Sequence, residues 1–134
     1  MARASSATDT PKYLGVKGNR PIDELDSFPA PVGCGRVVMT SDEVTAMCPV
    51  TGQPDYYTVS IDYLPAKRCI ESKSLKMYLW HFRDQGVFCE QLAVDIRDKV
   101  IATVRPREVH VKVMQKSRGG IVIEANSSRL RGKR

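Results

Sequence analysis

Several features are scarce in this sequence of 134 residues, and each absence narrows the class of protein. No stretch approaches the ~20 apolar residues that a membrane-spanning helix needs, and residues 1–9 lack the apolar run of a secretory signal. The sequence contains four cysteines and two histidines but no CxxC pair and no histidine at a zinc-ligand interval. We therefore expect a cytoplasmic protein with no membrane span and no metal site.

Positive charge is in excess, with 21 Lys and Arg against 15 Asp and Glu and a formal net charge of +6. This excess suits nucleic acid or an anionic small molecule such as a phosphorylated cofactor, and composition does not separate the two. The length fits one domain. Prolines and glycines in residues 1–33 predict an irregular N-terminal arm, residues 34–126 a folded domain, and residues 127–134 a basic C-terminal tail.

Alternation of apolar and polar residues predicts four strands. The long strand over residues 55–63 is the clearest, a weaker strand precedes it at residues 36–40, and the strands at residues 109–114 and 121–125 form a hairpin. Helical spacing predicts helices over residues 74–83 and 90–104. This order indicates an α+β fold, in which an antiparallel four-stranded sheet carries both helices on one face. Its edge strands favour oligomerisation.

A thiol and a carboxyl group lie close together just before the long predicted strand. Cys48 and Asp55 belong to one loop, in which Gly52 and Pro54 favour turns. A cysteine in such a place can act as a nucleophile if its pKa is lowered, and a neighbouring carboxyl group can transfer a proton. Taken alone, such a pair more often has a structural role, in which Cys48 packs under the loop and Asp55 caps the turn.

A second group of polar residues lies at the start of the first predicted helix. Ser72 or Ser74 is suited to cap this helix, and Glu71 could serve its first turn. Lys73 and Lys76 oppose the helix dipole, which favours negative charge there. This placement of lysines is typical of a site that binds phosphate.

Four motifs together resemble a known enzyme family, from about residue 28 to residue 126. They are Cys48-Pro-x-Thr-Gly-x-Pro-Asp55, Glu71-Ser-Lys-Ser-Leu-Lys76-x-Tyr78, Phe88-x-Glu90 and Arg118-Gly-Gly120. Their order and separations resemble those of the short NADPH-dependent 7-cyano-7-deazaguanine reductases, the nitrile reductases of queuosine biosynthesis. The resemblance implies a tunnelling fold (T-fold) catalytic domain over residues 34–126, in a ring-forming homo-oligomer with active sites at subunit interfaces.

The resemblance also implies the reaction, which reduces the nitrile of 7-cyano-7-deazaguanine to the amine of 7-aminomethyl-7-deazaguanine, for transfer RNA modification, with two NADPH. Cys48 would form a covalent thioimide with the nitrile carbon, and Asp55 would donate a proton to the nitrogen. Direct contact with nucleic acid is not implied. The remaining implied site residues are the substrate contacts Ile70, Glu71, Ser72, Cys89 and Glu90 and the cofactor contacts Ser72, Lys73, Arg118 and Gly119.

One position departs from the family pattern. Family members carry a histidine just before the glutamate equivalent to Glu90, where this chain has Cys89. A thiol is a poorer hydrogen-bond donor than imidazole and has a higher ordinary pKa. A reversible disulfide between Cys48 and Cys89 is a hypothesis for this position.

Three other functions are compatible with parts of the sequence. A relative could add ammonia to the same thioimide and form an amidine. A basic RNA-binding module would need exposed aromatic residues, whereas Tyr57, Tyr63 and Phe82 follow patterns typical of a core. A hydrolase similar to GTP cyclohydrolase would need zinc, for which the sequence offers no evident ligand set.

Overall fold

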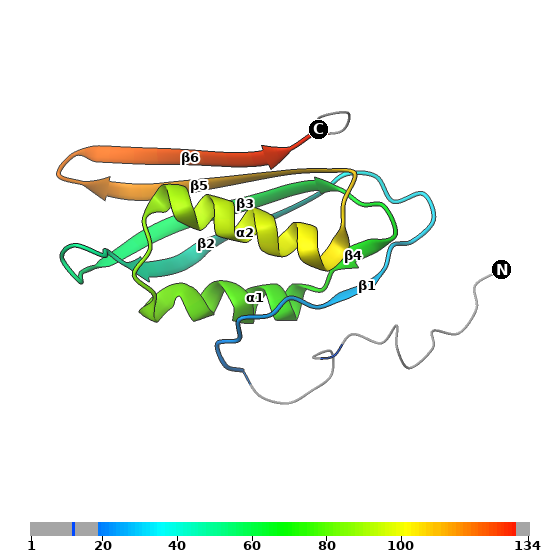
Figure 1. Cartoon of the computed structure of the whole chain (residues 1–134), viewed down its shortest axis with the longest axis horizontal. Coiled ribbons are helices and arrows are strands. Elements are labelled where there is room, and N and C mark those ends of the chain that lie inside the picture. The colour runs from blue at the N-terminus through cyan, green and yellow to red at the C-terminus, as the bar shows by residue number, and fades with distance from the viewer. Residues whose placement is uncertain (1–11, 13–18, 131–134) are drawn as a thin grey trace.

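A four-stranded antiparallel sheet, in the order β2-β3-β5-β6, forms the body of the protein. The computed structural model describes residue 12 and residues 19–130, and two helices cover one face of this sheet (Figure 1). The predicted α+β architecture is confirmed. The elements in chain order are β1 (Ser27–Pro29), β2 (Val37–Met47), β3 (Pro54–Leu64), β4 (Arg68–Ile70), α1 (Ser72–His81), η2 (Phe82–Asp84), α2 (Cys89–Val104), β5 (Glu108–Arg118) and β6 (Ile121–Arg129).

The core lies between the sheet and the helices. Alternate residues of β3 face the helices, and Val59 and Ile61 are at most 1% exposed. Leu92 and Ile96 present the apolar stripe of α2 to the sheet and are fully buried. Burial of each such side chain stabilises the fold by about 1.5–3 kcal/mol before entropy is counted.

Strand β2 continues seven residues past the predicted strand, and a bulge explains why the pattern did not show this. The register with β3 shifts by one residue between Ser41 and Val44. Val37 and Met39 pack against the core before the shift, whereas Val44 and Ala46 do so after it. An extra residue in one strand reverses the alternation of its side chains, so the apolar pattern loses its period of two.

The N-terminal region contains a short strand that the sequence pattern did not predict. Strand β1 pairs with β4 through Phe28 and Cys69, and Leu25 belongs to the core. Part of the expected irregular arm is thus attached to the body of the protein. Residues 1–11, 13–18 and 131–134, which include most of the arm and the end of the tail, lie outside the described residues. The domain boundaries at residues 33 and 126 stay predictions, and β6 extends past the second of them.

The predicted hairpin near the C-terminus is confirmed as β5 and β6. Its two-residue turn has positive φ at both positions, 59° at Gly119 and 81° at Gly120. Two-residue hairpin turns with this geometry favour glycine because it has no Cβ. The turn places Arg118 at the same end of the sheet as the loop between β2 and β3 (Figure 1).

Candidate active site

The loop that carries Cys48 is closed by its own backbone. The Cys48 amide donates to the carbonyl of Gln53 at 2.8 Å, and the Cys48 carbonyl accepts from the amide of Gly52 at 2.8 Å. Gly52 has a φ of 71°, which the tight turn requires. These bonds hold the thiol at the junction of β2 and β3.

The Cys48 thiol has a lowered pKa, about 7 against an ordinary value of 9.0. Hydrogen bonds from the side chain and backbone of Thr51 are the main cause, followed by the Val50 amide, and the Arg118 guanidinium adds to them. These donors stabilise the thiolate, which is the nucleophilic form of cysteine. About half of the Cys48 side chains are therefore ionised near neutral pH.

A carboxylate and a cation lie beside this thiol. Asp55, near the start of β3, is 4% exposed, and its Oδ1 lies 2.8 Å from Nη1 of Arg118. The hydrogen bond to Cys48 and the charge of Asp55 both raise the pKa of Arg118. Arg118 thus connects Cys48 and Asp55, and the predicted pair forms one cluster with it. Such a cluster can combine nucleophilic attack with proton transfer.

The start of α2 lies at the same end of the molecule. The Met47 amide donates to the Gln85 carbonyl at 2.8 Å, and the Val87 amide donates to the Met47 carbonyl at 3.2 Å. This backbone pairing attaches the segment before α2 to the end of β2. Glu90 lies in the first turn of α2, and its side chain is exposed. The role of Glu90 as a substrate contact stays a prediction.

Cys89, the other residue predicted at this end, is directed into the core. It is 2% exposed, and its Sγ donates to the carbonyl of Val113 at 3.7 Å. Burial raises the pKa of this thiol to about 11, and the charge of Glu90 adds to the effect. Cys89 therefore stays protonated at neutral pH. All four cysteines are free thiols in the structure, and the role of Cys89 as a substrate contact stays a prediction.

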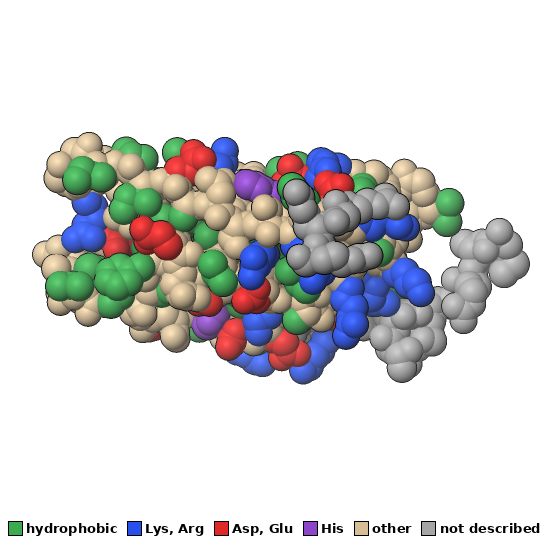
Figure 2. Space-filling model, turned by 45° about the horizontal axis from the view of Figure 1, so that its top comes forward, with side chains coloured by type: hydrophobic (Ala, Val, Ile, Leu, Met, Phe, Trp, Pro, Cys, Tyr) green, Lys and Arg blue, Asp and Glu red, His purple; other side chains and the backbone are tan. Residues whose placement is uncertain are grey.

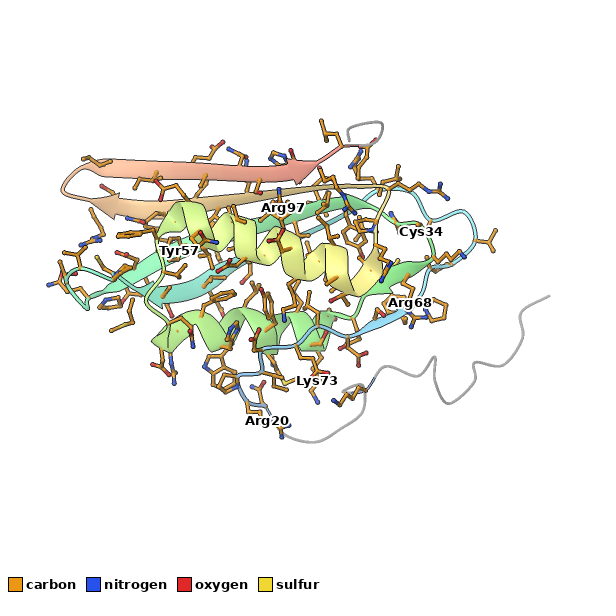
Figure 3. All side chains as sticks on the ribbon, viewed as in Figure 1. Arg20, Cys34, Tyr57, Arg68, Lys73 and Arg97 are labelled. Atoms are coloured by element: carbon orange, nitrogen blue, oxygen red, sulfur yellow. The ribbon has the colours of Figure 1, made fainter. Side chains whose placement is uncertain are left out.

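The other predicted substrate residues lie at the opposite end of the sheet. Helix α1 begins there and runs toward the Cys48 end (Figure 1). Its ten residues span about 15 Å. Figure 3 shows the separation, because Tyr57 lies near the Cys48 end and Lys73 lies near the start of α1. Within one chain the predicted site residues therefore form two separate groups, one around Cys48 and one around Ser72.

Local structure accounts for part of this second group. Glu71, rather than a serine, is the N-cap of α1, and its carboxylate accepts from the amides of Lys73 at 2.9 Å and Ser74 at 2.8 Å. A carboxylate can accept two such bonds, and its negative charge interacts favourably with the positive end of the helix dipole. Ile70 is buried in the core. Ser72 is exposed at the helix start.

Two surface hollows lie near the predicted cofactor residues. The larger, about 750 Å³, lies between β2 and α1 and includes Ser72, Lys76, Trp80 and Arg83 in its lining. The smaller, about 590 Å³, lies by the β5–β6 turn and includes Arg118 and Gly119. The sequence interpretation missed Trp80 and Arg83 as candidates. Their helical spacing from Ser72 and Lys76 is the signal that could have found them.

Comparison with known proteins identifies the family. Residues 54–132 match the family described as QueF-like protein. The chain belongs to the QueF-like family. This chain is 43% identical over 104 residues to the NADPH-dependent 7-cyano-7-deazaguanine reductase of Anaeromyxobacter sp. (strain Fw109-5), covering 76% of this chain and 85% of that one. The enzyme of the same name from Nitrosomonas europaea is 41% identical over 104 residues, covering 76% and 75%. The predicted family is therefore confirmed.

A solved structure of the QueF-like family supports the fold. The archaeosine synthase QueF-Like, in the apo form, superposes with a TM-score of 0.68 at 26% identity, covering 72% of this chain and 94% of that one. The predicted tunnelling fold of the subunit is thereby confirmed. Within the described residues no helix is long and apolar enough to cross a membrane. The same residues contain no group of three His, Cys, Asp or Glu side chains that could hold a metal ion.

Proposed function

We propose that this chain catalyses the NADPH-dependent reduction of the nitrile of 7-cyano-7-deazaguanine to a primary amine. The observation that carries the proposal is the Cys48 thiol, with a pKa of about 7, beside the Asp55–Arg118 ion pair. A nitrile carbon is electrophilic, and a thiolate can add to it at neutral pH. Membership of the QueF-like family, whose relatives bear the reductase name, supports the same substrate.

In the proposed first step, the Cys48 sulfur bonds to the nitrile carbon. One π bond of the nitrile becomes a lone pair on nitrogen, and the nitrogen takes a proton from Asp55. The Cys48 thiol supplies this proton to Asp55 when it ionises, so charge and protons balance. Arg118, 2.8 Å from Oδ1 of Asp55, holds the carboxylate in place for the transfer.

The base itself would be held by Glu90. Its carboxylate is exposed at the Cys48 end and can accept hydrogen bonds from the ring N–H and amino group of a deazaguanine. Paired hydrogen bonds of this kind fix the plane of the ring and the direction of its nitrile.

The side chains of the two hollows fit a phosphorylated dinucleotide. Lys76 and Arg83 provide cations and Trp80 an aromatic face in the larger hollow. Arg118 and the Gly119 backbone contribute in the smaller one. Cations of this kind bind phosphates, and an aromatic face can stack on a ring. NADPH supplies hydride when bound, and two molecules are needed because conversion of a nitrile to an amine takes four electrons.

The separation of the two residue groups supports a homo-oligomer with interfacial sites. A second copy can bring its Ser72 and Lys73 to the Cys48 end of the first, which one chain alone does not achieve. Large apolar side chains exposed around this end would be covered in such an assembly. They are Val50, Tyr56, Phe88, Ile121 and Val122. Figure 2 shows apolar and basic side chains together at this end of the surface.

The likeness to a protein named archaeosine synthase favours one alternative reaction. In it, ammonia adds to the thioimide and an amidine forms without hydride. The reductase is preferred because this chain is closer in sequence to the reductases, at 43% identity against 26%. Consumption of NADPH with the free base separates the two, since amidine formation leaves the cofactor unchanged.

Intact-protein mass spectrometry with the nitrile base and no NADPH tests the first step. We expect an adduct of the mass of the base on the wild type and none on Cys48→Ala. Cys34→Ala is the matched control, because Cys34 is a partly exposed thiol at the other end of the molecule (Figure 3). It should keep the adduct. An adduct that survives in Cys48→Ala would refute the assignment of the nucleophile.

A further inference from the structure

The hydroxyl of Tyr57 is buried without a hydrogen-bond partner. Within the described part of the chain, two buried side-chain atoms lack such a partner, the Tyr57 hydroxyl oxygen and Oδ1 of Asp55. Oδ1 of Asp55 forms an ion pair with Arg118 at 2.8 Å. Of these two atoms, only the Tyr57 hydroxyl oxygen therefore has neither a hydrogen bond nor an ion pair. A buried hydroxyl without a hydrogen-bond partner destabilises a fold, so a functional role for the Tyr57 hydroxyl would explain its presence.

This hydroxyl lies among the groups of the proposed reaction centre. Tyr57 follows Asp55 by two positions on β3, so both side chains project from the same face of the sheet. Electrostatic interactions with Asp55, Cys89, Cys48 and Arg118 all act on its hydroxyl. Tyr57 is fully buried, and this burial, more than the nearby charges, raises its pKa well above the ordinary range. The group therefore remains a neutral O–H donor at every pH at which the protein would work.

The nitrogen of the substrate is the acceptor that this donor would meet. In the proposed function, this nitrogen lies between Cys48, which is bonded to its carbon, and Asp55, which protonates it. The thioimide nitrogen keeps one lone pair after protonation and can accept a hydrogen bond. The other un-ionised donor nearby, the Cys89 thiol, donates to the Val113 carbonyl instead.

We propose that Tyr57 is a further catalytic residue, whose hydroxyl donates a hydrogen bond to the nitrile-derived nitrogen of the base bound at Cys48. This inference rests on the proposed function. The bond withdraws electron density from the thioimide carbon and so favours attack by hydride. Because Asp55 is 4% exposed and must also reach this nitrogen, substrate binding has to open the same pocket to both side chains.

Tyr63 provides a matched control on the same strand and the same face. It is also fully buried, but its hydroxyl accepts a hydrogen bond from the Ile70 amide at 2.9 Å. Removal of this hydroxyl leaves a buried amide without its acceptor, whereas removal of the Tyr57 hydroxyl leaves no protein group unpaired. The two tyrosine-to-phenylalanine changes should therefore have opposite signatures.

The experiment compares Tyr57→Phe, Tyr63→Phe and the wild type in thermal unfolding, in the rate of adduct formation with the nitrile base, and in kcat/KM for NADPH oxidation. For Tyr57→Phe we expect kcat/KM and the adduct rate to fall roughly tenfold or more, with an unfolding midpoint equal to or above that of the wild type. For Tyr63→Phe we expect a lower midpoint and a kcat/KM within about twofold of the wild type.

Two results would overturn the inference. One is a kcat/KM for Tyr57→Phe within about twofold of the wild type. The other is a loss of activity that accompanies an equal loss of unfolding midpoint in both variants, which would make the role of Tyr57 structural. Failure of the proposed function has a different signature, because the wild type would then form no adduct with the base and oxidise no NADPH.

Discussion

We predict that Thr51 controls the reactivity of Cys48, and removal of one hydroxyl tests this. Hydrogen bonds from Thr51 are the largest cause of the lowered pKa of Cys48. Thr51→Val keeps the shape of the side chain but removes its hydroxyl donor. Loss of a donor destabilises the thiolate, so the pKa of Cys48 should rise from about 7 toward its ordinary value of 9.0.

The size of the effect follows from the titration curve. A hydrogen bond to an ionised group is worth about 1.5 kcal/mol, which corresponds to about one pKa unit. At pH 7 the thiolate fraction would then fall from about a half to about a tenth, a loss of roughly fivefold. At pH 9 both proteins would be more than about 90% thiolate, and the difference would almost vanish.

Alkylation by iodoacetamide as a function of pH measures this directly. The assay is best made on a Cys34→Ala background, because Cys34 is partly exposed and would also be alkylated. The other three cysteines, Cys48, Cys69 and Cys89, are buried. Thr51→Ser is the control, since it keeps the hydroxyl and the bond that Oγ1 accepts from the Gln53 amide at 3.3 Å. A midpoint that is unchanged in Thr51→Val, or shifted equally in Thr51→Ser, would refute the reasoning.

Three further predictions concern stability, measured as the free energy of unfolding in urea. Glu71→Ala should destabilise the fold by about 1–2 kcal/mol because two amides at the start of α1 lose their acceptor. Glu71→Gln should retain part of the lost stability, and an equal loss of stability in both variants would contradict the capping role. Gly119→Ala should destabilise the fold by about 1 kcal/mol, since φ is 59° there. Gly35→Ala should be nearly neutral, because an added Cβ there meets no atom within 4 Å. Equal effects of the two changes would argue against backbone strain at Gly119. Leu92→Ala should cost about 2–5 kcal/mol, because the side chain is fully buried, and a cost below about 1 kcal/mol would place Leu92 outside the core.

Much of the fold could be predicted because its signals are local. The alternation in β3 and the helical spacing in α2 report burial directly, and both elements lie within one or two residues of their predicted bounds. The elements that were missed have weak local signals. The bulge between Ser41 and Val44 reverses the alternation in β2, and β1 has three residues whose partner, β4, lies about 40 positions along the chain.

The candidate site was predictable in its motifs but not in its geometry. Cys48 and Asp55 are seven residues apart and lie at the two ends of one loop, so their association could be inferred. The contact of Arg118 with Asp55 joins strands that are far apart in sequence, and the position of Tyr57 within the same cluster depends on how β3 packs. The contact of Arg118 with Asp55 has no sequence signal of its own, and the spacing of two places Tyr57 on the same face as Asp55 without showing what surrounds its hydroxyl.

The amino-acid sequence by itself determined the class of fold and the family and predicted Cys48 as the nucleophile, because periodicity, turn residues and motif spacing are properties of neighbouring positions. The tertiary structure alone decided which end of the sheet each group occupies. It placed the start of α2, which carries Glu90, at the same end as the Cys48 loop, directed Cys89 into the core and kept the start of α1 at the far end. The physical reason is that pairing and packing between distant segments set these positions, and no local pattern of residues encodes them.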